Sequence, residues 1–182
     1  MASIITATTT SGLTQSADNS GVLQLASGTG NLVTVPSVTG TAMVSGAMPA
    51  FSAYSATNQT GVASGVFTKV LFDTEEYDTN NNFASSRFTP TVAGYYQVTA
   101  RTDWSITSGA CFLTIYKNGT GYKSGQLNGA TGSGTGPTAS GLVYCNGSTD
   151  YIEIYAYQNN GTNTIFAGIA YTFFQAAMVR AA

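Results

Sequence analysis

The chain has 182 residues, of which 43% are hydrophobic and only 8% charged, and its formal net charge is −2. This length allows one domain with its own core plus an appendage, and uncharged polar residues and glycine must cover most of the surface. The six basic residues form no patch that could neutralise phosphates, which argues against nucleic-acid binding. The lack of His and the wide separation of Cys111 and Cys145 exclude zinc sites of the usual spacing.

Residues 1–46 form a region rich in Thr, Ser and Gly whose only charge is Asp18. Two short alternating runs, 22–25 and 32–35, flank Ser27–Gly30 and predict two strands joined by a turn. A two-stranded piece is not stable alone, so we expect an attachment arm docked on a partner surface, with a flexible linker as the alternative. The first residues lack the basic and apolar segments of a signal peptide, and no run approaches a membrane span. We therefore expect no export by the usual route and no membrane insertion.

Aromatic residues appear from Pro49 onward, where the composition changes. Alternating residues predict strands at 50–54 and 66–72, and a short strand at 87–89 that Pro90 closes. Between the last two lies an acidic, Asn-rich segment, Asp73 to Asn82, which holds four of the eight acids. Because such a segment cannot bury itself, we expect it to be a loop that bulges outward.

Residues 94–106 predict a long strand with its two faces clearly separated. One face carries Tyr96, Val98 and Ala100, and the other carries Tyr95, Gln97, Thr99 and Arg101. The next predicted strand, Cys111–Lys117, ends at Asn118-Gly119, which is the strongest short hairpin signal.

The last third of the chain continues the same pattern. A Gly-rich segment, Gly129 to Gly136, predicts a mobile loop, and two strands, 140–145 and 151–157, flank the turn at Asn146-Gly147. The apolar and aromatic run 167–179 predicts a fully buried central strand. No segment has a sustained helical period, so many short strands with Gly and Asn turns predict a β-sandwich or barrel.

Two further residue types need an interpretation. Cys111 is in phase with Leu113 and Ile115, which predicts a buried thiol in a strand, while a disulfide to Cys145 is the alternative that sequence does not decide. The glycosylation pattern Asn-x-Ser/Thr begins at Asn58, Asn118, Asn146 and Asn160. We interpret these four sites as turns.

Six residues from the end of the predicted strand 66–72 to the start of the predicted strand 94–106 form a spaced set that we call the framework residues: Phe72, Asp78, Phe83, Phe88, Gly94 and Tyr96. This set resembles the pattern of a known family, the globular head of complement C1q and its tumour-necrosis-factor-like relatives. Weaker echoes are Ala50–Ala53, Tyr116–Gly119, the strand pair from Leu142 to Ile154, and Phe174–Val179. The chain departs from the pattern because Phe83 and Phe88 are two residues closer together, and because Val98, Ala100 and Ala176 replace an expected Phe, aromatic and Gly.

This resemblance implies that residues 47–182 form a ten-stranded jelly-roll β-sandwich and a homotrimer with the closing strands at its axis. Eleven Tyr and nine Phe exceed the need of one small core, which agrees with subunit contacts rich in aromatics. The calcium sites of the family cannot be assigned to residues of this chain, because the sequence shows no multi-carboxylate motif with defined spacing. We expect Asp73, Glu75, Glu76 and Asp78 to be solvated, with a hard-cation site as the alternative.

The Gly-, Ser- and Thr-rich composition of residues 1–46 resembles that of the N-terminal segments of bacteriophage tail-fibre and capsid-decoration proteins. The resemblance implies a non-enzymatic, all-β, trimeric virion protein of the capsid decoration or cement type, made in the host cytoplasm, whose arm binds the major capsid protein or another virion protein. The first alternative is the receptor-binding head of a tail fibre or spike, which would contact host glycans or proteins through Tyr-rich faces and Gly129 to Gly136. The second alternative, a surface adhesin of cellular origin, is disfavoured by the lack of an export signal.

Catalysis has little support in this sequence. Without His, a general base would have to be a carboxylate or Lys. The pairs Glu75/Glu76 and Asp150/Glu153 show no sign of a pocket, although a depolymerase acting through paired carboxylates is an alternative. We therefore expect no enzyme, no catalytic or metal site and no cofactor.

Overall fold

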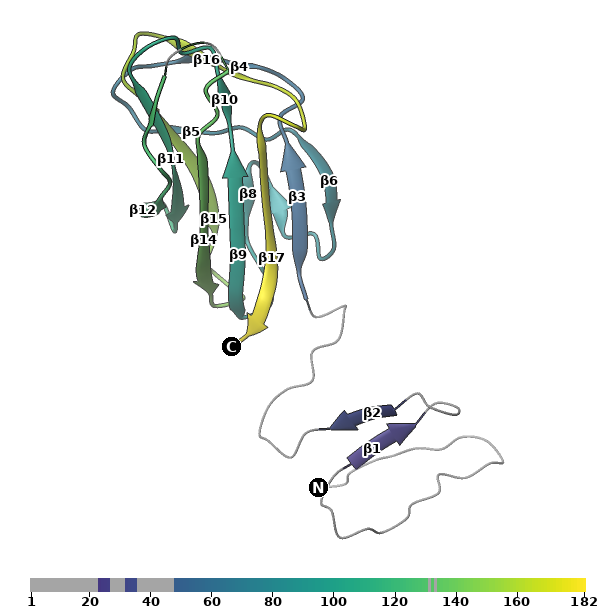
Figure 1. Ribbon diagram of the computed structural model, residues 1–182. Helices are drawn as coiled ribbons and strands as arrows, with labels where there is room; N and C mark the ends of the chain where they lie inside the picture. Colours follow the sequence, from purple (N-terminus) through teal and green to yellow (C-terminus); the bar gives the residue numbers. More distant parts are fainter. Residues whose placement is uncertain (1–22, 27–31, 36–47, 131, 133) are drawn as a thin grey trace. The chain divides into compact units, whose positions relative to one another are not determined.

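The computed structural model describes residues 23–26, 32–35, 48–130, 132 and 134–182. These described residues form strands, turns and bends without any helix, which confirms the predicted all-β class. No helix in this part of the chain could therefore cross a membrane. The chain divides into two compact units, Met1–Thr41 and Ala42–Ala182 (Figure 1).

The first unit contains one antiparallel strand pair. β1 (Leu23–Ala26) pairs with β2 (Leu32–Val35), with Leu23 opposite Val35 and Ala26 opposite Leu32. This pairing confirms the two predicted strands. The predicted turn, Ser27–Gly30, lies outside the described residues, and so does most of the predicted arm.

The second unit is a sandwich of two large sheets, of which the first has five strands in the order β14-β9-β17-β3-β6 (Figure 1). The strands are β3 (Ala50–Tyr54), β6 (Thr74–Asp78), β9 (Gly94–Arg101), β14 (Thr138–Cys145) and β17 (Phe173–Ala181). All of their pairings are antiparallel.

The second large sheet has seven strands, with the path β12-β11-β15-β8-β7 and with β13 and β5 added beside β11 and β15. The strands are β5 (Thr68–Lys69), β7 (Phe83–Ala84), β8 (Arg87–Phe88), β11 (Ala110–Lys117), β12 (Thr120–Ser124), β13 (Asn128–Gly129) and β15 (Ile152–Gln158). The predicted strand 66–72 is therefore reduced to the two residues of β5.

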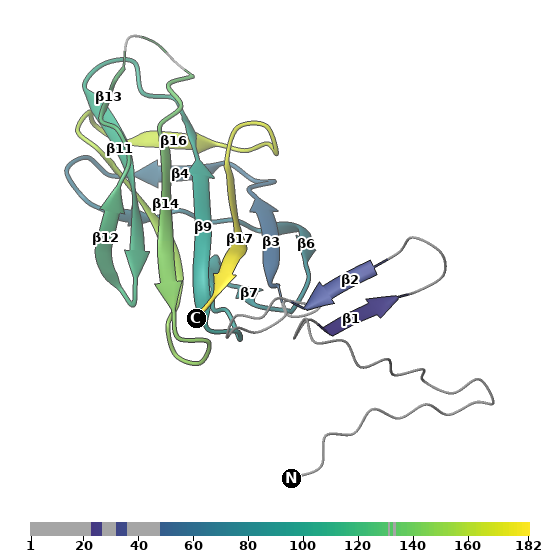
Figure 2. The same ribbon diagram turned by 60° about the horizontal axis from the view of Figure 1, so that its bottom comes forward.

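A small three-stranded sheet, β10-β16-β4, crosses the end of the sandwich away from the C-terminus (Figure 2). The strands are β4 (Gln59–Val62), β10 (Asp103–Trp104) and β16 (Asn163–Phe166). The long predicted strand 94–106 is thus divided between two sheets, because the chain turns from β9 into β10 at Thr102.

The core lies between the two large sheets and contains the framework aromatics. Phe51 stacks on Phe83 and Phe88 with ring centroids 4.8 and 4.5 Å apart, and it meets the edge of Phe174 at 4.8 Å. Tyr96 packs edge-on against Phe88 at 5.4 Å. Full burial of one such side chain contributes about 1.5–3 kcal/mol, and aromatic pairing adds to this. These rings therefore tie together strands from both sheets.

The two non-aromatic framework residues have specific backbone roles. A Cβ on Gly94 would lie 2.5 Å from the backbone oxygen of Arg180, so only glycine allows this close approach to β17. The Asp78 carboxylate accepts hydrogen bonds from the backbone N–H groups of Asn80 and Phe83, at 3.2 and 2.7 Å. Asp78 therefore holds the turn that leads into β7.

The acidic segment Asp73 to Asn82 is not a bulging loop, so that expectation was wrong. Its first half is β6, an edge strand that pairs with β3 and has a register irregularity between Ser52 and Ala53. Only the turn at Thr79–Asn82 leaves the sheet, and Asn82 itself is buried. The sequence is misleading because an exposed edge strand can carry charges that a central strand cannot.

The closing run is central but is not fully buried, which corrects a second expectation. β17 lies between β9 and β3, and its side chains alternate, with Phe174, Ala176 and Met178 buried. Gln175 and Ala177, on the opposite face, are exposed. Residues 167–172 form the turn before the strand rather than part of it.

The strands on either side of Asn146-Gly147 lie in different sheets, although their existence was predicted correctly. β14 pairs with β9 in the five-stranded sheet, whereas β15 pairs with β11 and β8 in the seven-stranded sheet. The segment 146–150 is therefore a crossing between sheets, and the strands on its two sides are not paired with each other.

Candidate interaction surfaces

The outer side of the five-stranded sheet carries several exposed apolar side chains, and we call it the five-stranded face. Its members are Tyr77, Tyr95, Leu142, Tyr144, Ala177 and Val179. Strand alternation places Tyr95, Leu142, Tyr144 and Ala177 here, because residues next to them along the chain fill the core. Tyr77 lies opposite Ser52 on the edge strand, and Val179 is exposed at the register irregularity between Met178 and Arg180. Tyr95 and Tyr144 are cross-strand partners with ring centroids 5.4 Å apart.

Neutral polar groups occupy the middle of the five-stranded face. The Gln97 side chain donates to the Ser140 hydroxyl at 2.9 Å, and Thr99 and Ser140 share a hydrogen bond of 3.2 Å. Two hollows interrupt the surface: one of about 190 Å³ beside Tyr77 and Ala177, and one of about 430 Å³ beside Tyr95 and Tyr144. This combination of exposed rings, neutral polar groups and hollows is typical of a surface that packs against protein.

The outer side of the seven-stranded sheet carries a different group of rings, which we call the aromatic cluster. Its members are Phe67, Phe112, Tyr116, Tyr155 and Tyr157. Phe67 contacts three of the other rings, at centroid distances of 5.2–6.0 Å, and Tyr116 stacks on Tyr155 at 4.0 Å. These rings cover one another, so less of each is available to a partner.

A nearly buried carboxylate lies beside the aromatic cluster. Glu153, 3% exposed, accepts hydrogen bonds from Lys69 Nζ at 2.8 Å and from Arg87 Nε at 2.9 Å. Burial opposes its ionisation, but the hydrogen bonds and charges of Lys69 and Arg87 outweigh that effect and hold the pKa of Glu153 below its usual range. Arg87 also lies over the Tyr151 ring, 3.8 Å from its centroid.

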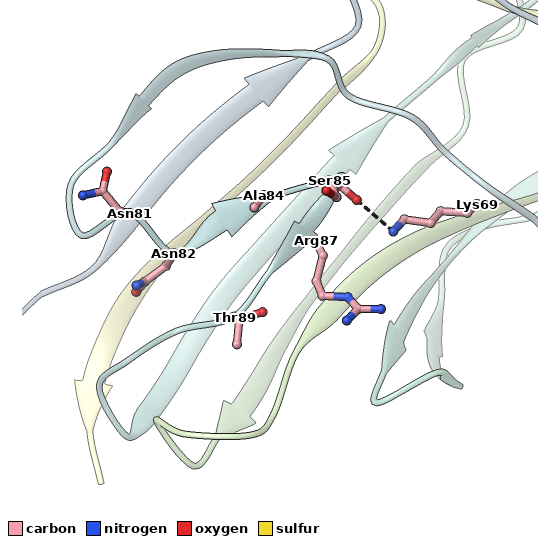
Figure 3. Close-up of a pocket in the computed structure, with 7 residues that line it drawn as sticks. All are labelled: Lys69, Asn81, Asn82, Ala84, Ser85, Arg87 and Thr89. Carbon is pink, nitrogen blue, oxygen red and sulfur yellow. Dashed lines mark hydrogen bonds between the residues drawn. The ribbon is translucent and has the colours of Figure 1, made fainter.

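The same two cations line a polar pocket of about 590 Å³, shown in Figure 3. Its lining is Lys69, Asn81, Asn82, Ala84, Ser85, Arg87 and Thr89. Ser85 has a positive φ of 52°, and its backbone oxygen accepts a hydrogen bond from Lys69 Nζ at 2.9 Å. The pocket is thus polar and cationic, with the guanidinium of Arg87 partly exposed, and it suits a small anionic or hydroxyl-rich group.

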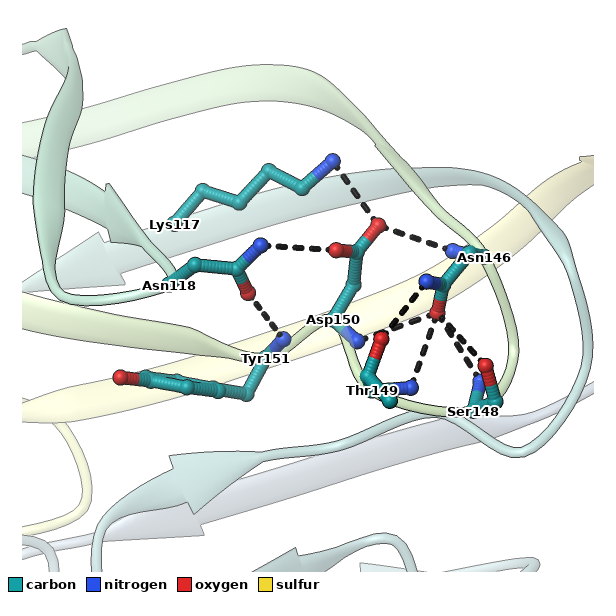
Figure 4. A network of polar contacts seen from close by, with 7 residues as sticks. All are labelled: Lys117, Asn118, Asn146, Ser148, Thr149, Asp150 and Tyr151. Carbon is teal, nitrogen blue, oxygen red and sulfur yellow. Dashed lines mark hydrogen bonds and ion pairs between the residues drawn. The ribbon is translucent and has the colours of Figure 1, made fainter.

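A second polar network joins two turns just before β15, at the same end of the strand as Glu153 (Figure 4). Asp150 accepts hydrogen bonds from the Asn118 side chain at 2.7 Å and from the Asn146 backbone at 3.0 Å, and it pairs with Lys117 at 2.9 Å. The hydrogen bond from Asn118 is the main cause that lowers the pKa of Asp150. These groups satisfy one another, so the network locks the two turns together.

The carboxylates that the sequence singled out do not converge. Asp73 accepts from the backbone of Ala56 at 2.6 Å, Glu76 accepts from Ser52 at 2.5 Å, and Asp78 holds its own turn. Asp150 and Glu153 are each engaged by separate cations. Within the described part of the chain, no group of three His, Cys, Asp or Glu side chains could hold a metal ion.

Both cysteines are free thiols buried in the core, one in each large sheet. Cys111 in β11 confirms the predicted buried thiol, and Cys145 in β14 has the same environment. Burial raises the pKa of each thiol to about 11. The alternative of a disulfide between them is therefore not what the structure contains.

Three of the four glycosylation-pattern asparagines begin turns, as predicted. Asn118 and Gly119 both have positive φ, and Asn146 and Asn160 precede Gly147 and Gly161, which also have positive φ. The side chain of Asn58 instead accepts a hydrogen bond from the backbone of Ala167 at 2.7 Å, across a long separation in sequence.

Sequence reasoning missed the Lys69–Glu153–Arg87 cluster and the pocket beside it. The only local signal was Glu153 at an otherwise aromatic face of a strongly alternating strand. Its two partners lie 84 and 66 residues away, and no local pattern encodes such a pairing.

No protein-family model matches the sequence, and no curated protein matches it. Solved structures share the fold. Murine APRIL aligns with a TM-score of 0.58 at 8% identity, over 72% of this chain and 99% of that chain. The tumour necrosis factor Eiger from S. frugiperda gives 0.52 at 8% identity, over 74% and 93% of the two chains.

The globular domain of zebrafish complement 1qA gives a TM-score of 0.51 at 15% identity, over 74% of this chain and 98% of that domain. Identities this low support a conclusion about fold alone. The second unit is accordingly a jelly-roll sandwich of the C1q/TNF-like type, as the framework residues predicted.

Proposed function

We propose that this protein is a non-enzymatic bacteriophage virion protein of the capsid decoration or cement type. In this proposal three jelly-roll heads form a homotrimer, and residues 1–46 attach each head to the major capsid protein or another virion protein. The C1q/TNF-like fold supports the trimeric head, and the phage context rests on the composition of residues 1–46.

The composition of the five-stranded face is the main support for the proposed trimer. On this face, exposed rings and aliphatic side chains surround neutral hydrogen-bonded groups. The centres of protein interfaces are likewise poor in charged residues. A patch of this kind on a closed ring of subunits removes apolar surface from water in every copy. The closing strand β17 runs through its middle, where the family resemblance places the trimer axis.

The β1–β2 pair of the arm is too small to form an independent folding unit. Two strands of four residues are not stable by themselves in water, and both strands have an open edge within the described part of the chain. Such edges can add to a sheet of a neighbouring protein. Three arms on one trimer would multiply weak individual contacts.

A truncation that lacks residues 1–46 tests the proposal. We expect the truncated head to sediment as a trimer, because its sandwich is a separate compact unit, and to fail to pellet with undecorated capsids that bind the full chain. If the truncated trimer still decorates capsids, the arm is not the attachment device. Immunogold labelling of virions would separate a capsid location from a tail location.

A second candidate, the receptor-binding head of a tail fibre or spike, is favoured by the pocket beside the aromatic cluster. Lys69 and Arg87 outnumber the one carboxylate that they share, so a carboxylate-bearing saccharide suits the site electrostatically. A glycan array tests this function. Retention of acidic glycans by the full chain and their loss in Arg87→Gln would support it, whereas no retention would count against it.

A further inference from the structure

The chain contains four Asn-Gly pairs, at Asn118, Asn128, Asn146 and Asn160. Asn-Gly is the dipeptide in which the backbone nitrogen of the second residue most readily reaches the side-chain carbon Cγ of the first, because glycine has no Cβ and wide conformational freedom. Attack of that nitrogen on Cγ requires that the asparagine side chain be free to rotate toward it. The surroundings of the four side chains differ sharply in this respect.

Asn118 and Asn146 are held at both ends of their amide groups (Figure 4). The nitrogen of Asn118 donates to Asp150, and its oxygen accepts from the Tyr151 backbone at 2.9 Å. The oxygen of Asn146 accepts from the backbone N–H groups of residues 148, 149 and 150, each at 3.0 Å, while its nitrogen donates to the Thr149 hydroxyl at 2.8 Å. Rotation of either side chain would break several hydrogen bonds.

Asn160 is held through its side-chain nitrogen and its backbone. The nitrogen donates to the backbone oxygen and to the hydroxyl of Ser108, at 2.9 and 2.6 Å. Its backbone N–H donates to the Gln158 side chain at 2.7 Å, and its carbonyl accepts from the Asn163 side chain. This pair is thus restrained on both sides of the reacting atoms.

Asn128 differs, because its side chain makes no hydrogen bond to any described residue. It lies in β13, a two-residue strand that pairs only with β11 among the described strands. Gly129 stands opposite Ala110, whose N–H and C=O are both engaged with Asn159. The N–H of Gly129 therefore points away from β11, toward the unpaired edge.

The space around Gly129 is open as well. A Cβ built on this residue would meet no atom within 4 Å, and its φ is not in the positive region. The Asn128–Gly129 pair thus combines an unrestrained side-chain amide with open space, whereas Gly161 has open space but its neighbour Asn160 is held by hydrogen bonds.

We propose that Asn128 is a site of spontaneous deamidation. The Gly129 nitrogen, after loss of its proton to hydroxide, attacks Cγ of Asn128, and the Asn128 amide leaves as ammonia to give a five-membered succinimide. Water then opens the ring at one of its two carbonyls, which yields aspartate or isoaspartate. One neutral side chain becomes a carboxylate, so the protein gains one negative charge beside the Gly129–Gly136 segment.

The test is to age the full chain in mildly alkaline buffer and to map its peptides by mass spectrometry. Deamidation adds about 1 Da to a peptide. We expect Asn128 to be modified about tenfold or more faster than each of the other three asparagines, because their side chains must first give up hydrogen bonds. Equal rates in the folded protein, or faster modification of Asn118, Asn146 or Asn160, would overturn the proposal.

Two controls assign the difference to the structure. In concentrated urea, all four pairs should react at similar rates, since the folded restraints are gone; a persistent preference for Asn128 there would show that local sequence is the cause, contrary to the proposal. The variant Gly129→Ala should slow modification of Asn128 in the folded protein, because the added methyl hinders attack while fitting into open space. An unchanged rate in this variant would exclude the succinimide route.

Discussion

The outer faces of the two large sheets both carry aromatic residues, but the contacts that these residues make differ between the two faces. On the seven-stranded sheet, the rings of the aromatic cluster cover one another, and Glu153 is neutralised by two cations of the same chain. On the five-stranded face, Tyr77 and Val179 are 52% and 54% exposed, and no cluster of rings covers them. The rings of the first face contact one another, although Phe67 among them is still 41% exposed. The exposed apolar side chains of the second face are instead spread over β6, β9, β14 and β17, and they leave area that a second copy can cover.

This difference shows how one sandwich can direct assembly to a single side. Area that rings already bury against each other gives little further gain on association. The cation Arg180 lines the hollow beside Tyr95 near the end of β17. At the middle of the five-stranded face, however, apolar area around neutral hydrogen bonds loses water without burying a charge. The five-stranded face is therefore the side that we expect to drive self-association.

The largest expected effect is on the oligomeric state. Ala177→Glu places a carboxylate at the centre of the five-stranded face, where a trimer would desolvate it and bring three like charges together. We expect sedimentation velocity to show a trimer for the unmodified chain and a monomer for the variant. Thr60→Glu, on an exposed position of β4, is the matched control; a variant at Ala177 that remains trimeric would place the interface elsewhere.

The next largest effect concerns the outer face of the seven-stranded sheet. Glu153→Gln removes the charge that Lys69 and Arg87 share, and we expect the free energy of unfolding to fall by about 1–3 kcal/mol. Denaturant titration measures this change. Glu75→Gln, at an exposed position of the edge strand, should change the free energy of unfolding by less than about 0.5 kcal/mol. Equal changes for the two variants would show that the Lys69–Glu153–Arg87 cluster does not stabilise the fold.

A smaller effect is expected for the ring at the centre of the aromatic cluster. Phe67→Ala removes three ring contacts from a side chain that is 41% exposed, and we expect a loss of about 1 kcal/mol in the free energy of unfolding. Leu127→Ala, at a 61% exposed position without such contacts, provides the comparison. A cluster that contributed nothing would give the two variants equal midpoints of denaturation.

Acidification should lower the free energy of unfolding through two carboxylates near the start of β15, Glu153 and Asp150. The pKa values of Glu153 and Asp150 are lowered by folding, from ordinary values of 4.5 and 3.8. Their stabilisation is therefore complete above those ordinary values and is lost as the pH falls through the lower folded values. Denaturant titrations at a series of acidic pH values should show this decline, and Glu153→Gln should show a shallower one; parallel curves would contradict the assignment.

The smallest effect is expected where the two sheets are alike, in the core between them. Cys111 and Cys145 are buried thiols with pKa values raised to about 11, so almost no thiolate exists at neutral pH. An alkylating reagent should leave both unmodified in the folded protein and should label both after denaturation without a reductant. Failure to label the denatured chain would reveal a disulfide.

The amino-acid sequence by itself determined the parts of this fold that depend on local pattern. Alternation predicted β9 and β11, and Asn118-Gly119 predicted the turn after β11, because side-chain direction and positive φ are properties of a few consecutive residues. The spacing of Phe72, Phe83, Phe88 and Gly94 indicated the family fold that the structure contains.

Only the tertiary structure decided which segments lie side by side. It made Thr74–Asp78 an edge strand, assigned β14 and β15 to opposite sheets, and exposed one face of β17. It also brought Lys69 and Arg87 to Glu153 across more than sixty residues of sequence. Strand partners and ion pairs of this kind depend on non-local register, which follows from how both sheets pack around one aromatic core and which no short stretch of the chain encodes.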